Sequence, residues 1–205
     1  MSLRIDIKNL SHYFKDKPLY NDLNYVFSAG SKTAILGENG SGKSTFLKVV
    51  SGFLTPSKGV IDYSSNETRI DLNQVHKLTC ACSPFLKLED HFTLEEAFDF
   101  HFSFKDLKKN LTKDDFFKIC YLENDVKKLV KDLSSGMTQR FKLCLSILTE
   151  SKLLLLDEPC SNLDKKGRAL FHSLLSDYLM DTTLIVASNS IKDEISFCSS
   201  SLDLS

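Results

Sequence analysis

The 205-residue sequence lacks several features that identify a class of protein at sight. It contains no tryptophan and only four prolines, and none of its apolar runs approaches the roughly 18 residues of a membrane-spanning helix. The richest runs, 153–156 and 183–187, have the length of strands. The N-terminal residues alternate between polar and apolar and lack the apolar stretch of a signal peptide. These absences argue against a membrane-spanning or secreted chain and predict a cytosolic one.

The cysteines form no recognisable pattern. The six of them include no C-x-x-C pair, and their spacing matches neither a zinc site nor a disulfide framework. Most stand among apolar neighbours, so we expect free thiols that behave as small buried hydrophobes. Cys80 and Cys82 are two residues apart, and on a strand both side chains would face the same side.

The sequence also lacks an excess of charge of either sign. Its 26 lysines and arginines against 27 aspartates and glutamates give a net charge of −1, which creates no long-range attraction to nucleic acid or anionic lipid. Charged residues make up 26% and hydrophobic residues 42% of the chain, as in ordinary globular proteins. We therefore expect one folded domain, no nucleic-acid partner, and partners recognised by local chemistry.

The order of apolar patterns predicts an α/β fold with a mainly parallel sheet. Alternating segments near the N-terminus indicate an antiparallel β subdomain with one wet face, and unbroken apolar runs that alternate with helices indicate parallel strands covered on both faces. Thr93 and Thr112, each followed by acidic residues, are expected N-caps in an inserted helical subdomain. The expected strands are 3–8, 23–27, 32–36, 60–63, 152–156, 183–188 and 202–204, with helices at 45–51, 165–180 and within 93–150.

A glycine-rich segment between the strand at 32–36 and the helix at 45–51 has the form G-x-x-x-x-G-K-S. Its glycines let backbone amides curl around phosphate oxygens, and the helix that follows presents unpaired N–H groups. Lys43 is expected to reach the β- and γ-phosphates and Ser44 to bind Mg²⁺. The residues predicted to bind the nucleotide here are Gly37, Glu38, Asn39, Gly40, Ser41, Gly42, Lys43, Ser44 and Thr45.

Two carboxylates, Asp157 and Glu158, end the four-leucine strand. A parallel strand delivers such residues to the edge of the sheet where ligands bind. We expect Asp157 to be the second anchor of Mg²⁺. Glu158 is expected to orient and deprotonate the attacking water as the general base.

Further along the chain, Leu133-Ser134-Ser135-Gly136-Met137-Thr138-Gln139-Arg140 resembles the LSGGQxQR signature of ATP-binding cassette (ABC) ATPases, and Pro159-Cys160-Ser161-Asn162-Leu163-Asp164 resembles their D-loop. The resemblance covers essentially the whole chain. It implies a P-loop NTPase core at about 1–80 and 151–205, with a helical insert at about 85–150 that carries the signature.

The resemblance also implies an activity and partners. The protein would be the ATP-binding and ATP-hydrolysing subunit of an ABC transporter, using ATP and Mg²⁺, peripheral on the cytoplasmic face of a membrane through an integral membrane permease. Each ATP would lie between the phosphate loop of one chain and the signature of a second copy, or of a related cassette, in a head-to-tail dimer. Ser134, Ser135, Gly136 and Asp164 would then contact ATP.

Phe14 precedes Gly37 by about the distance at which the family places an aromatic side chain that stacks on adenine. The resemblance therefore implies that Phe14 binds the base. A core aromatic on an alternating strand is the alternative.

Three departures from the family pattern affect the mechanism. The stretch 80–86 contains no glutamine, and Ser83 or Pro84 falls nearest the position where the family has one that touches magnesium. Asn189, within Ser188-Asn189-Ser190, replaces the usual switch histidine; its amide can donate a hydrogen bond but cannot exchange a proton near neutral pH. Ser135 and Met137 replace Gly and Gln in the signature. We therefore expect ATP binding and slow hydrolysis, with Glu158 as the principal base and Lys43 and Asn189 as further catalytic residues.

Two functions remain open from the sequence. The first is the transporter subunit, for which apolar residues of the helical insert offer a docking groove, although these residues also suit a core. The second is a nucleotide-gated interaction module that hydrolyses ATP slowly and transports nothing. The groove residues in question are Phe85, Leu86, Phe92 and Phe98.

Overall fold

The computed structural model describes residues 2–15, 17–84, 86–179, 181–189 and 191–204. The chain divides into two compact units. The first comprises 1–81, 151–158 and 181–205, and the second comprises 82–150 and 159–180. The insertion of one unit into the other follows from the sequence order, because the chain leaves the first unit twice and returns to it twice.

The first unit begins with an antiparallel sheet. It consists of β1 (Arg4–Phe14), β2 (Lys17–Phe27), β4 (Lys58–Ser65) and β5 (Thr68–Ile70), in the order β2-β1-β4-β5. Ile5 and Ile7 point into the core, while Lys8 on the wet face pairs with Asp62 at 3.1 Å. The strands are longer than the alternation predicts because the register of β1 against β2 shifts after Ile7 and again after Leu10. Each shift interrupts the period of two by which a strand is recognised.

A second, five-stranded sheet lies in the same unit. It contains β3 (Lys32–Leu36), β6 (Thr79–Cys82), β7 (Leu153–Asp157), β8 (Thr183–Ala187) and β9 (Ser200–Asp203), in the order β6-β7-β8-β3-β9. Strands β7, β8, β3 and β9 pair in parallel. Every residue of β7 and β8 is buried, which confirms the prediction drawn from their unbroken apolar runs. The α/β fold with a mainly parallel sheet is thus confirmed.

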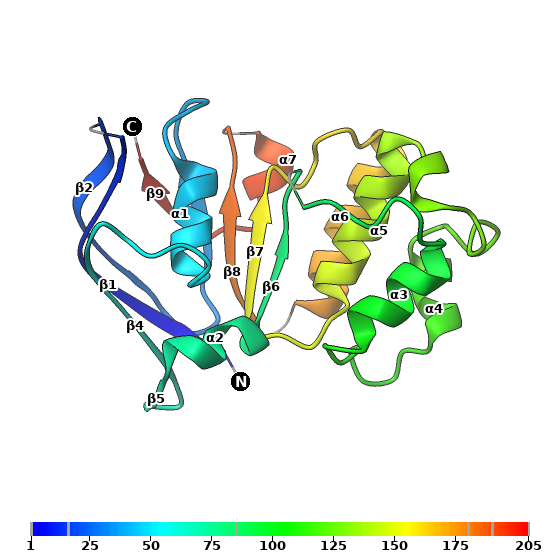
Figure 1. Ribbon diagram of the computed structural model, residues 1–205, viewed down its shortest axis with the longest axis horizontal. Helices are drawn as coiled ribbons and strands as arrows, with labels where there is room; N and C mark the ends of the chain where they lie inside the picture. The colour runs from blue at the N-terminus through cyan, green and yellow to red at the C-terminus, as the bar shows by residue number, and fades with distance from the viewer. Residues whose placement is uncertain (1, 16, 85, 180, 190, 205) are drawn as a thin grey trace. The chain divides into compact units, whose positions relative to one another are not determined.

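Helix α1 (Lys43–Val50) packs on strands β7 and β8 of the parallel sheet (Figure 1). Its Phe46 is fully buried, and the ring lies 5.6 Å from that of Tyr20 and 6.3 Å from that of Phe27, both on β2. The antiparallel sheet, α1 and the parallel sheet therefore share one hydrophobic core. Two short helices, α2 (Leu72–Leu78) and α7 (Lys192–Ile195), complete the unit.

The second unit is helical. It contains α3 (Leu94–Phe102), α4 (Lys113–Ile119), the 3₁₀ turn η1 (Val130–Asp132), α5 (Ser135–Ile147) and α6 (Lys165–Tyr178). Thr93 and Thr112 are the N-caps of α3 and α4, as predicted, and each also forms a capping box. Phe98, Phe116 and Phe141 join three helices, with ring centroids 4.8 Å apart for the first pair and 5.7 Å for the second. Helix α6 groups with this unit although its sequence follows the insert.

Five of the six cysteines are buried and Cys198 is half-buried, and none of the six forms a disulfide, as predicted. Cys80 and Cys82 are buried on either side of the exposed Ala81. Across the described parts of the chain, no helix combines the length and the apolar character needed to cross a membrane.

His101 is a half-buried titratable group in the helical unit. Burial, together with the nearby charge of Lys105, lowers the pKa of His101 from 6.5 to about 4. Its Nε2 lies 2.9 Å from Thr149 Oγ1, and that hydroxyl donates its only proton to the carbonyl of Leu145. The His101 ring therefore donates through Nε2 and is neutral near neutral pH.

We predict that this histidine makes folding sensitive to mild acid. Between its ordinary pKa of 6.5 and the folded value of about 4, the unfolded chain binds a proton that the folded chain does not, so stability falls as the pH is lowered. His101→Gln should remove about 2 kcal/mol of the difference in the free energy of unfolding between pH 7 and pH 5, measured by urea titration. The exposed His91→Gln is the control and should retain the wild-type difference. If the free energy of unfolding of His101→Gln differs between pH 7 and pH 5 by as much as that of wild type, the prediction is contradicted.

Candidate functional site

The loop 37–42 joins β3 to α1 and has the backbone of a phosphate cradle. Gly37, Gly40 and Gly42 have φ values of 147°, 88° and 96°, a region that residues with a side chain rarely adopt. A Cβ on Gly37 would lie 2.4 Å from Ser41 Oγ, and one on Gly42 would lie 3.1 Å from Leu19 Cβ. A Cβ at either position would crowd a neighbouring side chain, and together with the positive φ values this favours glycine at both.

A pocket of about 350 Å³ opens beside this loop. The Oγ atom of Ser41 is buried there without a hydrogen-bond partner, as suits a loop made to receive further acceptor or donor groups. Pro18 and Leu19 of β2 contribute an apolar wall that the sequence did not predict, because the register shifts of β1 against β2 obscure which residues of β2 face inward. The lining residues are Pro18, Leu19, Glu38, Asn39, Gly40, Ser41 and Leu204.

Lys43 is the buried cation of the cradle, with only 6% of its surface exposed. Its Nζ donates to the backbone oxygens of Gly37 at 2.8 Å and Glu38 at 2.9 Å, and to Asn189 Oδ1 at 2.6 Å. Three acceptors match the three protons of an ammonium group. The lysine is thus held over the loop, at the place where the sequence predicts phosphate.

Asp157 and Glu158 lie at the carboxyl end of β7, as predicted. Asp157 is 5% exposed, and the Glu158 amide continues the sheet by donating to the Ala187 carbonyl at 2.9 Å. Glu158 then adopts a φ of 46°, an uncommon conformation for a residue with a side chain. This turn ends the strand. The carboxylate of Asp157 and the hydroxyl of Ser44 both offer oxygen atoms, the kind of ligand that Mg²⁺ prefers, and their binding of Mg²⁺ stays a prediction.

Asn189 joins the lysine to the glutamate. Its Nδ2 donates to Glu158 Oε1 at 3.1 Å, while its Oδ1 accepts from Lys43. The preceding Ser188 is fully buried; its amide donates to the Ile35 carbonyl, and its hydroxyl donates to the buried Glu194. The turn that carries Asn189 is therefore anchored independently of the Asn189 side chain. Ser190 lies outside the described residues.

Phe14 stands at the end of β1 and is 66% exposed. The alternative of a core aromatic is therefore wrong: Phe14 is the last residue of β1 and lies beyond Ser11, the last buried residue of that strand. An exposed ring has a face available for stacking. Its contact with adenine stays a prediction.

In the helical unit, the signature residues lie at the start of α5. The hydroxyl of Ser134 accepts from the Met137 amide at 3.2 Å and so caps the helix. A Cβ on Gly136 would lie 3.3 Å from the Asn162 carbonyl, so the signature and the D-loop segment are close neighbours. Asp164 is exposed and caps α6 by accepting from the Gly167 amide at 2.7 Å. Ser135 is exposed. The binding of ATP by these residues stays a prediction.

Two further side chains of α5 hold nearby loops and were not predicted. Gln139 is buried and donates to the Pro159 carbonyl at 2.9 Å. The buried amine of Lys142 points to the Pro84 carbonyl at 3.5 Å, and burial lowers the pKa of Lys142. The helical period of the signature segment is the signal that places Gln139 and Lys142 on one side of α5. Phe85 lies outside the described residues.

The comparisons with known proteins decide the family. Residues 20–161, well over half of the chain, match the ABC_tran family model, which describes ABC transporters. The chain belongs to this family. It is an ABC nucleotide-binding domain, and the P-loop NTPase core implied by the sequence resemblance is confirmed.

Relatives of this ABC domain cover nearly all of its length. It is 29% identical over 196 residues to the Nod factor export ATP-binding protein I of Rhizobium meliloti, covering 94% of this chain but only 58% of that protein. It is 28% identical over 204 residues to the uncharacterized ABC transporter ATP-binding protein YybJ of Bacillus subtilis, covering 98% of this chain and 92% of that one. The fold matches that of the bacterial ABC transporter cassette MJ0796, solved as a dimer, with a TM-score of 0.80 at 20% identity over 98% of this chain and 94% of that one.

We predict that the buried hydroxyl of Ser41 costs stability in the nucleotide-free domain. A buried polar group without a partner is unfavourable, so Ser41→Ala should raise the free energy of unfolding by about 1 kcal/mol, measured by urea titration without nucleotide. Ser51→Ala is the matched control, because the Ser51 hydroxyl donates to the Lys48 carbonyl and accepts from the Phe53 amide. The control should lower stability. A loss of stability in both variants contradicts the prediction.

Proposed function

We propose that this chain is the ATP-hydrolysing subunit of an ABC transporter and drives a separate integral membrane permease. One observation carries the proposal: Lys43 in the phosphate cradle and Glu158 at the end of β7 are joined through the single amide of Asn189. The cation that would bind phosphate and the carboxylate that would activate water therefore belong to one hydrogen-bonded group.

ATP is the proposed substrate, with its phosphates in the cradle 37–44 and its adenine against Phe14. Thr45 follows the cradle in the first turn of α1 and completes the proposed contacts. Ser44 and Asp157 would hold Mg²⁺, which neutralises charge on the phosphates. Lys43 would bind the β- and γ-phosphates, because a desolvated ammonium attracts phosphate oxygens strongly.

Hydrolysis would rely on Glu158 as the base that orients the attacking water and takes its proton. Asn189 cannot take up and release a proton near neutral pH, so it supports Glu158 only by hydrogen bonding. We propose slow turnover for this reason.

A second chain would complete the site. The sequence holds one phosphate cradle and one signature segment, so two complete sites need two copies, or one copy and a related cassette. We propose an ATP-dependent head-to-tail dimer in which Ser134, Ser135 and Gly136 of one chain, together with Asp164, meet the ATP bound by the other. Hydroxyls and amides at the N-terminus of α5 suit the γ-phosphate.

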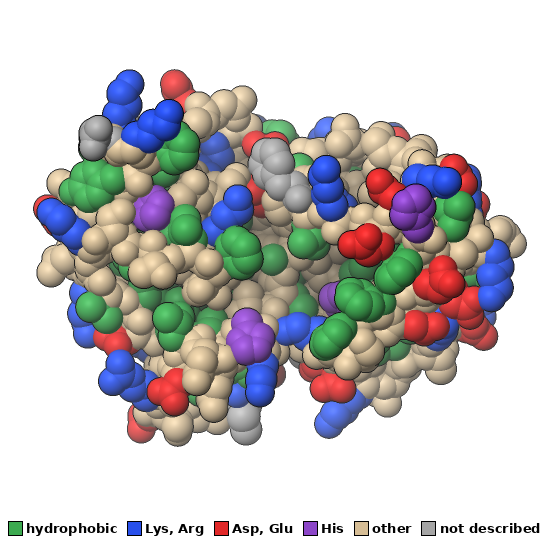
Figure 2. All heavy atoms as spheres, in the orientation of Figure 1, with side chains coloured by type: hydrophobic (Ala, Val, Ile, Leu, Met, Phe, Trp, Pro, Cys, Tyr) green, Lys and Arg blue, Asp and Glu red, His purple; other side chains and the backbone are tan. Residues whose placement is uncertain are grey.

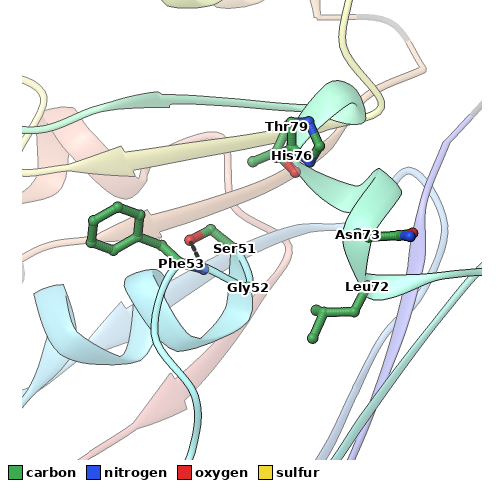
Figure 3. Close-up of a pocket in the computed structure, with 7 residues that line it drawn as sticks. All are labelled: Ser51, Gly52, Phe53, Leu72, Asn73, His76 and Thr79. Carbon is green, nitrogen blue, oxygen red and sulfur yellow. Dashed lines mark hydrogen bonds between the residues drawn. The ribbon is translucent and has the colours of Figure 1, made fainter.

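The permease would bind exposed apolar side chains on both units. In the first unit, a pocket of about 700 Å³ lies between the end of α1 and helix α2, with Phe53 83% exposed and Leu72 60% exposed beside it (Figure 3). In the helical unit, Phe100 and Phe104 are 55% and 74% exposed, with rings 5.4 Å apart, and Figure 2 shows hydrophobic side chains gathered in the region of α3. A transporter subunit must contact the part of its transporter that spans the membrane, and solvent-exposed aromatic rings suit such a contact. The protein would then be peripheral on the cytoplasmic face.

The first test removes the proposed base. Glu158→Gln keeps the hydrogen-bonding shape but cannot accept a proton, so kcat for ATP should fall at least about 100-fold while ATP binding persists. Phosphate release measures turnover, and light scattering with ATP measures the dimer, which the variant should retain. The exposed Glu123→Gln is the control and should keep wild-type turnover. Wild-type turnover in Glu158→Gln would sink the assignment.

The second test concerns the permease. Phe53→Asp and Phe104→Asp should each reduce recovery of a polytopic membrane protein with the tagged subunit at least about fivefold, because a charge on a buried apolar contact is unfavourable. The ATPase rate of the purified variants should stay within about twofold of wild type. Val60→Asp, on the wet face of the antiparallel sheet, is the control and should leave recovery unchanged. If a stable ATP-bound dimer forms and no membrane protein is recovered with wild type, the transport role is wrong.

A further inference from the structure

The amide of Asn189 is engaged at both ends, and the chemistry of its partners fixes its orientation. A lysine ammonium can only donate, so the atom 2.6 Å from Lys43 Nζ is Oδ1. An ionised carboxylate can only accept, so the atom 3.1 Å from Glu158 Oε1 is Nδ2. A flipped amide would set donor against donor and acceptor against acceptor. The arrangement is therefore specific to these three side chains.

Lys43 has no hydrogen-bonding capacity left in this arrangement. Its three protons meet Gly37 O, Glu38 O and Asn189 Oδ1, all within 2.9 Å, and 6% of the residue is exposed. A phosphate oxygen can receive a hydrogen bond from Lys43 only if one of the three acceptors withdraws. Two of them are carbonyls of the loop backbone, and the Glu38 carbonyl also accepts from the Ser41 amide. The third belongs to an exposed side chain, so it is the one most easily displaced.

We infer that Asn189 is a positioning residue that competes with nucleotide phosphate for Lys43. Without nucleotide, Asn189 Oδ1 accepts a hydrogen bond from Lys43 and Asn189 Nδ2 donates one to Glu158. Binding of phosphate to Lys43 displaces Oδ1, and the amide then stays attached to Glu158 alone. This inference deepens the proposed function and rests on it, since it gives Asn189 a part in nucleotide affinity as well as in placing the base.

The side chain of Asn189 is not needed to hold its own turn. Ser188 is fully buried, its amide donates to Ile35 O at 3.1 Å, and its hydroxyl accepts from the Ile191 amide at 3.2 Å. Truncation at Asn189 therefore removes the two side-chain hydrogen bonds and leaves the backbone contacts in place. A change in nucleotide affinity in an Asn189 truncation variant then reports the loss of the hydrogen bond between Asn189 and Lys43.

The decisive measurement is the affinity for ADP, which carries the β-phosphate without the γ-phosphate. Asn189→Ala removes the competing acceptor, so ADP should bind about three- to tenfold more tightly than to wild type in isothermal titration calorimetry. The kcat for ATP should fall at least about fivefold in the same variant, because Glu158 loses the donor that orients it. A residue that merely stabilised the fold or bound phosphate directly would weaken ADP binding when truncated.

A double-mutant cycle tests whether the effect passes through the lysine. In a Lys43→Ala background, Asn189→Ala should leave the affinity for ADP unchanged, because there is no lysine left to compete for. The exposed Asn124→Ala in the helical unit is the matched control and should bind ADP as wild type does. Thermal unfolding checks that each variant is folded.

The outcomes separate the inference from the proposed function. Unchanged or weaker ADP binding by Asn189→Ala, or tightening that persists in the Lys43→Ala background, overturns the inference even if Glu158→Gln is inactive and wild type hydrolyses ATP. Failure of wild type to bind either nucleotide overturns the proposed function, and the inference with it.

Discussion

The hydrogen bonds of the Lys43 ammonium group are the interaction on which the rest of the site depends. A lysine with 6% exposure is tolerated because three oxygens within 2.9 Å replace the water that it loses. Two of these oxygens come from a loop that only glycine can shape at Gly37. The third comes from Asn189, at the far end of the sequence. The Lys43 ammonium group thus connects the cradle to Asn189, which follows β8, and through Asn189 to Glu158, which follows β7.

The parallel sheet explains why residues so distant in sequence meet. Strands β3, β7 and β8 are neighbours and run in the same direction. The cradle, Glu158 and Asn189 follow the carboxyl ends of these strands, so all three lie at the same edge of the parallel sheet. The apolar residues of β7 and β8 help to keep this edge in place, because all of them are buried and both faces of the two strands are covered. The positive φ of Glu158 then ends β7 immediately beyond Asp157. The strands and the turns that follow them therefore fix the positions of Lys43, Glu158 and Asn189.

The sequence predicted correctly those structural features that depend on residues close together in the chain. The N-caps at Thr93 and Thr112, the buried runs of β7 and β8, and the glycine-rich loop each depend on neighbouring residues, and all were predicted. The antiparallel strands were predicted too short, because their bulges depend on pairing between segments rather than on either segment alone. The apolar wall at Leu19 was missed for the same reason.

The sequence by itself determined the family resemblance and predicted the phosphate cradle and the two carboxylates, because each is written in a short stretch with fixed spacing. It also predicted, from the family resemblance, that Asn189 stands where a histidine is usual. Only the tertiary structure decided that Asn189 bridges Lys43 to Glu158, and that Phe14 faces solvent. Both facts depend on which strands are neighbours and on the direction in which the chain leaves each strand. The sequence pattern does not contain this spatial information.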